Sequence, residues 1–325
     1  MDYLSLIQQP IGSELAEFVT LFNDLLSYPH GLLNAALTHI RQRGGKRMRP
    51  ILILLMAKNF GRVSPVTLNA AASIELLHTC SLVHDDVVDE SDERRGQASV
   101  NATYNNKVAV LVGDYIISSA LLSVSRTHNT RIIERMAELG RTLAVGEILQ
   151  LTNIDNKDLS EDVYYQIIER KTAVLFESSA QFGAISAGAS EDEIAAAGRF
   201  GHGIGMIFQI RDDIFDYFDS PEIGKPTGND MTEGKLTLPV LHALNTCPDN
   251  AMLDLAMRVK GGKVSSDEIA RLVAFTKANG GIDYAEQKMA EIAADAQLFI
   301  DQYAVDGGIK SALKAYLDYV IERRY

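Results

Sequence analysis

The chain has 325 residues, with 31 Lys and Arg against 43 Asp and Glu, which leaves a formal net charge of −12. This excess of acidic residues argues against a protein that binds nucleic acid or an anionic membrane, because such binding calls for a basic face. The hydrophobic content of 46% is enough for one large core or two smaller ones.

The cysteine content and the amino terminus bear on the compartment. Cys80 and Cys247 are too few for a disulfide scaffold and fit a reducing compartment. The opening residues MDYLSLIQQP lack the basic start and the apolar stretch of a secretory signal. Apolar stretches stay short of the roughly 18 uninterrupted residues of a membrane-spanning helix. We therefore expect a cytoplasmic protein without stable membrane insertion.

The positions of proline indicate where long helices can form. No proline occurs from Val66 to Ser220 or from Asp249 to Tyr325, and apolar residues recur there at spacings of three and four. Alternation typical of strands is scarce. These patterns predict an all-α protein of about a dozen helices. Breaks between helices are expected at 59–65, 101–106, 127–130, 152–159, 188–192 and 221–234. Because no Gly/Ser linker divides the chain, residues 1–325 are expected to form a single domain.

The first segment with a chemical signature is GGKRMRP, residues 44–50. It is predicted to lie at a loop-to-helix junction. Its glycines would let the backbone approach a ligand, and its cations suit phosphate groups. Arg47 alone is expected to be an ordinary solvated surface cation.

An acidic motif, Asp85-Asp86-Val-Val-Asp89, follows at the C-terminal part of a predicted long helix. Asp85 and Asp89 share a helix face, where like charges cost about 0.2–0.5 kcal/mol. The helix dipole also disfavours anions at a C-terminus. Mg²⁺, which takes one or two carboxylates together with water and phosphate oxygens, would compensate for this charge. The alternative is an acidic helix end that is simply solvated.

Cations follow this motif along the chain. Arg94-Arg95-Gly96 comes soon after it, and Lys171-Thr172 is predicted to lie within a helix between apolar stretches. The apolar neighbours of Lys171 indicate a partly buried ammonium group, which needs an anion.

The acidic pattern then occurs a second time, as Asp212-Asp213-Ile-Phe-Asp216, again near the end of a predicted helix. The repetition weakens the alternative of a solvated helix end. Gly224-Lys225 and Gly234-Lys235 bracket a glycine-rich loop after it. Clustered carboxylates beside clustered cations predict a site for a metal ion and a diphosphate.

With these motifs, the chain resembles the trans-prenyl diphosphate synthases, and most closely the bacterial long-chain (octaprenyl-type) enzymes. The similarity runs from about residue 44 to 244 and rests on GGKRMRP, HTCSLVHDDVVDESDERRG, VGDY (112–115), GEILQL (146–151), KT (171–172) and GMIFQIRDDIFDYF with GKPTGNDMTEGKLTLP. The resemblance implies an isoprenoid synthase-type bundle of long helices around a deep central cavity, usually in a homodimer. It also implies isopentenyl diphosphate and an allylic diphosphate as substrates.

The resemblance further implies roles for individual residues. The catalytic group would be Asp85, Asp86, Asp89, Arg94, Lys171, Asp212, Asp213 and Asp216. Within it, Asp85, Asp89 and Asp212 would hold roughly two or three Mg²⁺ ions, while Asp86, Asp213 and Asp216 would act through water or from behind these ligands. The allylic diphosphate would contact Arg94, Lys171, Lys225 and Lys235, with Thr172 and Gln209 beside the reacting carbons. Isopentenyl diphosphate would be bound by Gly45, Lys46, Arg49, His78 and Arg95.

Product length is expected to depend on the residues about one turn before the first motif. In short-chain members an aromatic side chain there closes the floor of the cavity, whereas this chain has the small residues Cys80 and Ser81. Each added isoprene unit needs on the order of one helical turn, ~5.4 Å. We expect farnesyl or geranylgeranyl diphosphate to be extended to a quinone side chain of about eight units (about C40). Two small residues at a close helix contact are the other explanation, and Leu121, Leu122 and Val124 are candidates for the stop.

Other functions fit parts of the sequence. A shorter-chain (farnesyl or geranylgeranyl) synthase is one alternative. A non-catalytic subunit of a heteromeric synthase is another, although such subunits tend to lose one aspartate motif or the Arg pair, and this chain keeps both. Terpene cyclases share D-D-x-x-D, but their second metal motif usually mixes Asn, Ser or Thr with Glu. Glu75-x-x-His78 matches half of a di-iron signature, and no second Glu-x-x-His occurs in the chain.

Overall fold

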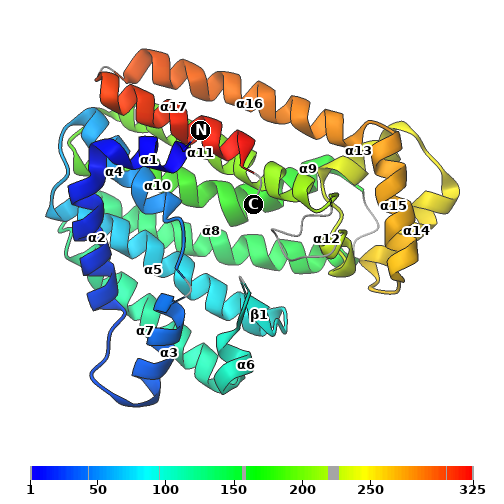
Figure 1. Cartoon of the computed structure of the whole chain (residues 1–325), viewed down its shortest axis with the longest axis horizontal. Helices are drawn as coiled ribbons and strands as arrows, with labels where there is room; N and C mark the ends of the chain where they lie inside the picture. The colour runs from blue at the N-terminus through cyan, green and yellow to red at the C-terminus, as the bar shows by residue number, and fades with distance from the viewer. Residues whose placement is uncertain are drawn as a thin grey trace. The chain divides into compact units, whose positions relative to one another are not determined.

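The computed structural model describes residues 2–42, 44–94, 96–155, 159–218, 227–304 and 306–323. Helices dominate this part of the chain (Figure 1). The strands within it are β1 (Glu93–Arg94) and β2 (Gln97–Ala98), which pair antiparallel with Glu93 opposite Ala98. The prediction of an all-α fold is confirmed.

The helices follow one another with short connections. Before residue 160 they are α1 (Tyr3–Gln8), α2 (Gly12–Leu25), α3 (Gly31–Gln42), α4 (Met48–Phe60), α5 (Pro65–Val88), α6 (Val100–Tyr104), α7 (Asn106–Ser125) and α8 (Thr130–Asp155). After it come α9 (Glu161–Ile168), α10 (Val174–Ser186), α11 (Glu191–Phe215), α12 (Asn229–Thr232), α13 (Leu238–Thr246), α14 (Asn250–Lys260), α15 (Ser266–Ala278), α16 (Gly281–Tyr303) and α17 (Gly307–Glu322). A 3-10 turn, η1 (Gln9–Ile11), joins α1 to α2, and a π-helical turn, η2 (Glu169–Ala173), joins α9 to α10.

The longest helices lie where the sequence has no proline. They are α5, α8, α11 and α16, with 24, 26, 25 and 23 residues. Pro65 occupies the first turn of α5, and the Ser64 hydroxyl caps this helix by accepting from the Thr67 backbone N–H at 3.4 Å. The expected number of about a dozen helices is too low, because short helices such as α1, α6 and α12 contain too few residues to show a period.

The chain divides into two compact units, which we describe one at a time. The first contains Met1–Gly140, Ser178–Gly198 and Gln302–Ala315, and the second contains Arg141–Glu177, Arg199–Asp301 and Tyr316–Tyr325. The prediction that residues 1–325 form one domain stays a prediction.

Helix α4 supplies the centre of the core in the first unit. All residues of 51–57 are fully buried, so this helix is apolar all the way round. Helix α5 packs on α2, α4 and α7, and Figure 1 shows α5 and α7 running alongside each other. The end of α5 is therefore held by neighbours on several sides.

The second unit has a core cluster built by α12 to α15. It contains Met231, Val240, Leu244, Leu255, Ala256, Val259, Ile269, Leu272 and Val273. Tyr217, which follows the end of α11 and is 1% exposed, joins the same cluster. This tyrosine fixes the chain just after the second aspartate motif.

Among the residues that the structure describes, two helices have the length and hydropathy of membrane spans, α5 and α7. In α5, 56% of the apolar window is buried inside the protein, and in α7 the share is 44%. Core helices of globular proteins have the same composition, and these two pack on each other. They are therefore weak evidence for a membrane span, and the absence of stable insertion stays a prediction.

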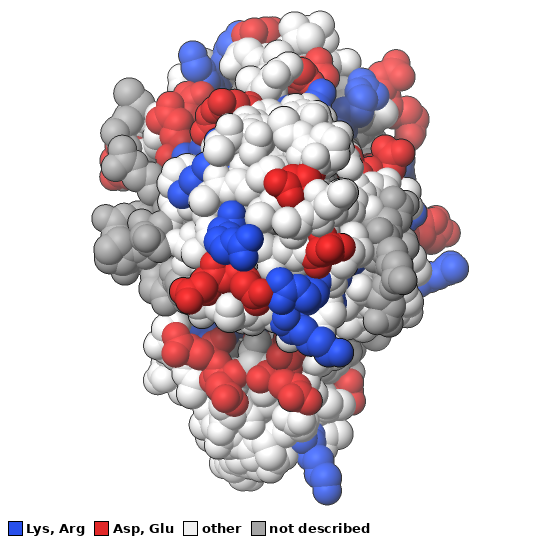
Figure 2. Space-filling model, turned by 90° about the vertical axis from the view of Figure 1, so that its right-hand side faces the viewer, with Lys and Arg blue, Asp and Glu red and all other residues white. Residues whose placement is uncertain are grey.

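Charged side chains of both signs are interspersed on the face drawn in Figure 2. Among the described residues in that view, no continuous basic field gathers. The described residues of this face therefore offer no continuous basic patch to a polyanion such as nucleic acid.

A glycine brings α11 close to η2 in the second unit. A Cβ added to Gly205 would lie 2.5 Å from the Cα of Ala173, a backbone atom that cannot rotate away. We expect Gly205→Ala to lower the free energy of unfolding by about 1–3 kcal/mol, because the two elements must separate. Urea denaturation of both proteins measures this difference.

The matched control is Gly140→Ala, within α8, where an added Cβ meets nothing within 4 Å. Alanine is the better helix former there, so this variant should be more stable by roughly 0.5–1 kcal/mol. Equal effects of the two substitutions would contradict the close approach at Gly205.

Candidate functional site

The first aspartate motif lies at the end of α5, as the sequence predicts. The helix ends at Val88, and the backbone N–H of Asp89 donates to the carbonyl oxygen of Asp85 at 2.8 Å. Asp85 is half-buried and Asp89 is exposed. Two carboxylates one turn apart thus stand where the helix dipole disfavours anions, which favours uptake of a cation.

Asp86 differs from these two because it is fully buried. Its Oδ1 lies 2.5 Å from Nε of Arg94 on β1. Its backbone carbonyl accepts from Nδ2 of Asn101 at 3.2 Å and from the N–H of Ser91 at 2.9 Å. A buried carboxylate needs a charged partner, and here the partner is an arginine that the resemblance assigns to a diphosphate.

A glycine on α7 makes room beside the first motif. A Cβ on Gly113 would lie 2.1 Å from Nε2 of His84. That nitrogen lies 3.3 Å from the carbonyl oxygen of Val110 and 3.8 Å from a carboxylate oxygen of Asp114. The motif VGDY therefore has a packing role, because its glycine admits the side chain that precedes Asp85.

The two small residues before the first motif have different surroundings. Cys80 is 4% exposed, and its Sγ lies 3.7 Å from Nδ1 of His84. Burial, with the charges of Asp114 and Asp85, raises the pKa of the Cys80 thiol to about 12, so this thiol stays protonated. Ser81 is only half-buried. The more open position is therefore Ser81.

The residues on α7 that could stop elongation of the product also differ in their exposure. Val124 is 3% exposed and belongs to the core, whereas Leu121 and Leu122 are 57% and 58% exposed. Val110 and Leu111 are exposed as well, by 41% and 67%. The spacing of these four residues places them in one exposed stripe of α7, in two apolar pairs with the exposed Asp114 and Ser118 between them.

A pocket in the first unit gathers residues from α2 to β1. Its lining consists of Phe22, Asn23, Leu26, Ile40, Arg41, Gly44, Gly45, Arg47, Glu75, His78, Thr79, Leu82, Val83 and Arg94. Gly45 and His78 belong to the group implied to bind isopentenyl diphosphate. The structure places Arg94 with them, although the resemblance assigns it to the allylic diphosphate.

The burial and pocket contacts of the other cations of GGKRMRP differ from those expected. Arg47 lines this pocket and is half-buried, so it is not an ordinary surface cation. Lys46 is exposed and Arg49 is half-buried, and neither belongs to the lining. Arg95, also implied to bind isopentenyl diphosphate, lies outside the described residues.

The second aspartate motif lies at the end of α11, and its first carboxylate meets the carboxyl-terminal part of the chain. The Asp212 side chain is 41% exposed, and its Oδ1 lies 2.5 Å from Nη2 of Arg323. The guanidinium group of Arg323 lies 3.6 Å from the ring centroid of Phe208 and donates to its carbonyl oxygen at 2.8 Å. The residue after α17 is thus bound to the part of α11 that carries Asp212.

Asp213 is 3% exposed, and protein donors reach both of its oxygens. The Tyr164 hydroxyl donates to Oδ2 at 2.7 Å, and Nε2 of Gln209 donates to Oδ1 at 2.8 Å. Oε1 of Gln209 accepts from the Thr172 hydroxyl at 2.7 Å. Burial, with the charge of Asp230, raises the pKa of the Asp213 carboxyl well above its usual range. Protein groups therefore contact both oxygens of Asp213, and its expected action through water or from behind the metal ligands stays a prediction.

Asp216 follows α11 directly and binds the start of α12. Its Oδ1 accepts from the backbone N–H of Asn229 at 2.8 Å, and its Oδ2 accepts from that of Asp230 at 3.2 Å. Its carbonyl oxygen accepts from the N–H of Gly228 at 2.8 Å. The last carboxylate of the motif therefore holds the turn that leads to Lys235.

Lys171 lies in the π-helical turn η2, a feature that sequence periodicity does not reveal. Its Nζ lies 2.7 Å from Oε1 of Glu147 and donates to Oε1 of Gln150 at 3.0 Å. A Cβ on Gly146 would lie 2.9 Å from a side-chain carbon of η2, so this glycine lets α8 come close. The motif GEILQL thus supplies the anion that the sequence predicts for Lys171.

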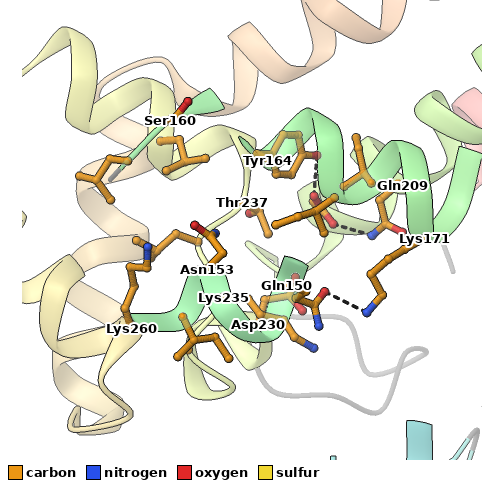
Figure 3. A pocket seen from close by; sticks show the side chains of 18 of the residues that line it. Gln150, Asn153, Ser160, Tyr164, Lys171, Gln209, Asp230, Lys235, Thr237 and Lys260 are labelled. Atoms are coloured by element: carbon orange, nitrogen blue, oxygen red, sulfur yellow. Dashed lines mark hydrogen bonds between the residues drawn. The ribbon is translucent and has the colours of Figure 1, made fainter. Parts of the chain in front are cut away.

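A pocket of about 210 Å³ in the second unit is lined by several of these residues, including Lys171, Gln209 and Asp213 (Figure 3). Its lining consists of Gln150, Asn153, Ile154, Leu159, Ser160, Tyr164, Ile167, Ile168, Lys171, Thr172, Gln209, Asp213, Asp230, Gly234, Lys235, Leu236, Thr237, Leu241 and Lys260. Lys235 Nζ lies 2.6 Å from Oε2 of Glu233, and Lys260 is 6% exposed. Three ammonium groups from three elements therefore belong to one pocket. Lys225 lies outside the described residues.

The donor chemistry of both helix ends fits Mg²⁺. Asp85, Asp89 and Asp212 offer partly or fully exposed carboxylates, and Mg²⁺ combines one or two carboxylates with water and phosphate oxygens. Within the described ranges, no group of three or more His, Cys, Asp or Glu could hold a metal ion by itself. A Mg²⁺ site that takes its remaining ligands from a diphosphate and water needs no such group.

Sequence reasoning missed Tyr164, Lys260 and Arg323. Glu147 lies inside a quoted motif, and its spacing of three from Gln150 places both on one helix face, which could have indicated a shared partner. Nothing in the local sequence distinguishes Lys260 or Arg323 from other cations of the tail, because their places depend on helix packing.

Comparisons with known proteins agree with one another. A model of the polyprenyl synthetase family matches residues 30–275. The octaprenyl diphosphate synthase of Haemophilus influenzae is 37% identical over 292 residues, which cover 88% of this chain and 87% of that protein. The geranylgeranyl pyrophosphate synthase structure from Bacteroides thetaiotaomicron is 48% identical, with a TM-score of 0.88 over 99% of this chain and 100% of that chain.

A third relative was solved with ligands. The polyprenyl synthase of Caulobacter crescentus, in complex with calcium and isoprenyl diphosphate, is 30% identical, with a TM-score of 0.92 over 99% of this chain and 98% of that chain. The family model and the 37% identical relative each match most of the chain. The chain therefore belongs to the polyprenyl synthetase family, and it is an enzyme of the trans-prenyltransferase class.

Proposed function

We propose that this enzyme catalyses the Mg²⁺-dependent head-to-tail condensation of isopentenyl diphosphate with an allylic diphosphate, farnesyl or geranylgeranyl diphosphate. The product proposed is a long-chain all-trans polyprenyl diphosphate of about eight units, about C40, each unit needing roughly one helical turn of space. Its use in a quinone side chain and a cytoplasmic location are part of the same proposal.

The observation that carries the proposal is that each aspartate motif adjoins its own cation-lined pocket. In the first unit, Arg94 both lines a pocket and binds Asp86. In the second unit, Lys171 and Lys235 line the pocket that also contains Asp213. Two separate anion sites, each beside carboxylates, suit an enzyme whose two substrates both carry a diphosphate.

We assign metal binding to Asp85, Asp89 and Asp212, whose carboxylates are partly or fully exposed. Bound Mg²⁺ would supply positive charge against the diphosphate as negative charge develops on it. The calcium in the Caulobacter crescentus complex supports a divalent ion in such a site. Arg323, which pairs with Asp212, adds a fixed positive charge beside this carboxylate.

The protein's own residues have a defined part in the reaction. Lys171 and Lys235 would bind the allylic diphosphate and stabilise it when its C–O bond breaks and the electron pair stays on oxygen. The double bond of isopentenyl diphosphate then attacks the allylic carbocation, which forms the new C–C bond. A proton leaves the neighbouring carbon for the departing diphosphate, and a new double bond results. No side-chain base is required.

The long product is supported by the small residues before the first motif and by the octaprenyl synthase among the relatives. The second candidate is a geranylgeranyl synthase. It is favoured by the name of the 48% identical structure. Product size separates the two, because both use the same chemistry and the same aspartate motifs.

We also propose a homodimer. Val110, Leu111, Leu121 and Leu122 form the exposed apolar stripe on α7 described above. Exposed apolar side chains gathered on one side of a helix are typical of contact sites between proteins. A second copy of the chain is the occupant that the family resemblance implies. A heteromeric partner is the alternative, and it would make this chain one subunit of two.

The first test is turnover. The enzyme should incorporate labelled isopentenyl diphosphate into farnesyl diphosphate, with products of about seven to nine units after dephosphorylation and reversed-phase chromatography. EDTA should abolish incorporation, and added Mg²⁺ should restore it, because the carboxylates alone cannot neutralise the leaving group. Products of three or four units would favour the shorter-chain candidate. No incorporation under either condition would favour the non-catalytic subunit.

Ser81 tests the basis of product length. Ser81→Phe should shorten the dominant product by one or more units, about one helical turn of space each, because an aromatic ring fills a half-buried position. Ser81→Ala keeps the position small and should leave the product distribution unchanged. Chromatography of both product mixtures decides, and an unchanged distribution with Ser81→Phe would place the floor elsewhere.

The dimer is tested on α7. The test replaces Leu111, which is 67% exposed, by Glu. The dissociation constant of the dimer should rise by about tenfold or more, because a charge enters an apolar contact. Leu298→Glu on α16 is the matched control, since that leucine is 55% exposed and lies off the stripe. Sedimentation velocity at several concentrations measures both. If Leu111→Glu sediments like the parent protein, the α7 contact is wrong.

A further inference from the structure

We propose that Tyr164 is a positioning residue for the condensation reaction: its hydroxyl holds Asp213, and Asp213 fixes the amide of Gln209, which in turn orients Thr172. This inference rests on the proposed function, because its meaning depends on the pocket being the place of the reaction. Tyr164 lies outside both aspartate motifs and outside every cation cluster of the sequence.

Three hydrogen bonds connect Tyr164 to Thr172. They measure 2.7 Å from the Tyr164 hydroxyl to Asp213, 2.8 Å from Gln209 to Asp213, and 2.7 Å from the Thr172 hydroxyl to Gln209. Figure 3 shows Tyr164 and Gln209 approaching the same carboxylate from different elements. The chain of bonds runs from α9 through α11 to η2, so it ties three elements together at one wall of the pocket.

The direction of each bond matters for the chemistry. Nε2 of Gln209 donates to Oδ1 of Asp213, so the amide turns its NH₂ group toward this carboxyl group. Its carbonyl oxygen is then left to face Thr172, whose hydroxyl donates to it. If Asp213 were not held in place, nothing in this network would keep the Gln209 amide in this orientation. The orientation of a polar group beside the reacting carbons therefore depends on one tyrosine hydroxyl behind them.

Burial makes this network rigid. Tyr164 is 5% exposed and Asp213 is 3% exposed, so water has little access to replace the hydroxyl. A hydrogen bond in such surroundings is electrostatically stronger than one in water. Burial also raises the pKa of the Tyr164 phenol well above its ordinary value, so it remains a donor at neutral pH.

Lys171 is held by a separate set of contacts, to Glu147 and Gln150 on α8. Loss of the Tyr164 hydroxyl should therefore leave the ammonium group in place. Binding of a diphosphate should be retained, while the step that needs oriented Gln209 and Thr172 should become slower. This separation distinguishes positioning from a general loss of structure.

The test compares Tyr164→Phe with Tyr165→Phe. Both remove one hydroxyl and keep the ring, and Tyr165 is the adjacent residue, which does not line the pocket. We expect kcat to fall by about tenfold or more in Tyr164→Phe, with KM for the allylic substrate changed by less than about threefold. Tyr165→Phe should keep the parent values. Calorimetric titration with inorganic diphosphate should give the parent stoichiometry for all three proteins, which counts the intact sites.

A double-mutant cycle tests the route through Asp213. If Tyr164 acts through this carboxylate, adding Tyr164→Phe to Asp213→Asn should change kcat by less than about twofold, measured in single turnover with labelled substrate. An equal loss in both backgrounds would overturn the proposal, as would full kcat in Tyr164→Phe or a loss of diphosphate-binding sites that matches the loss of rate. If the parent enzyme itself shows no turnover, the proposed function fails and the inference falls with it.

Discussion

Negative charge at the ends of two helices is the constraint on which this structure depends. Both aspartate motifs stand where the helix dipole disfavours anions, and like charges sit one turn apart. Specific donors meet the buried Asp86 and the carboxylates of the second motif. Arg94 pairs with Asp86, Arg323 pairs with Asp212, and hydroxyl, amide or backbone N–H groups donate to the other two of the second motif. The hairpin after α5, the start of α12 and Arg323 after α17 are all bound to the motifs in this way.

Much of the fold follows from the sequence because its signals are local. Absence of proline and apolar spacing depend on neighbouring residues alone, so they locate α5, α8, α11 and α16 and place both motifs at helix ends. The position of the motif GGKRMRP at the start of α4 is also predictable, because the glycines and the proline that mark a helix start are local. Short helices escape this reasoning because a period cannot be seen in four to six residues, as in α12, α6 and α1.

The parts of the site that the sequence does not predict depend on contacts between distant residues. Arg323 is 111 residues from Asp212 in the chain, counted as 323 − 212, and no local pattern connects them. Tyr164 on α9 and Asp213 on α11 are 49 residues apart, so their bond likewise depends on how helices pack, as do the π-helical turn η2 and the close approach of Gly205 to it. The sequence also does not show which aspartates of a motif are buried. Asp86 and Asp213 belong to the same D-D-x-x-D pattern as the exposed Asp89, yet both are buried and bound by protein groups.

The cations proposed to bind diphosphate already have carboxylate partners, so substrate binding is an exchange. The pairs Lys171–Glu147 and Lys235–Glu233 are partly exposed, and such pairs stabilise a protein by about 0–1 kcal/mol. A diphosphate can therefore displace either glutamate at little cost.

The pair Arg94–Asp86 is different, because its carboxylate is fully buried and losing its partner would cost about 3–5 kcal/mol. Nε of Arg94 makes the bond to Asp86, and a guanidinium group carries five N–H donors. Arg94 can therefore bind a phosphate through its other nitrogens without releasing Asp86. The lysines would thus exchange partners during each cycle of substrate binding, while the arginine would serve two anions at once and keep the end of α5 in place.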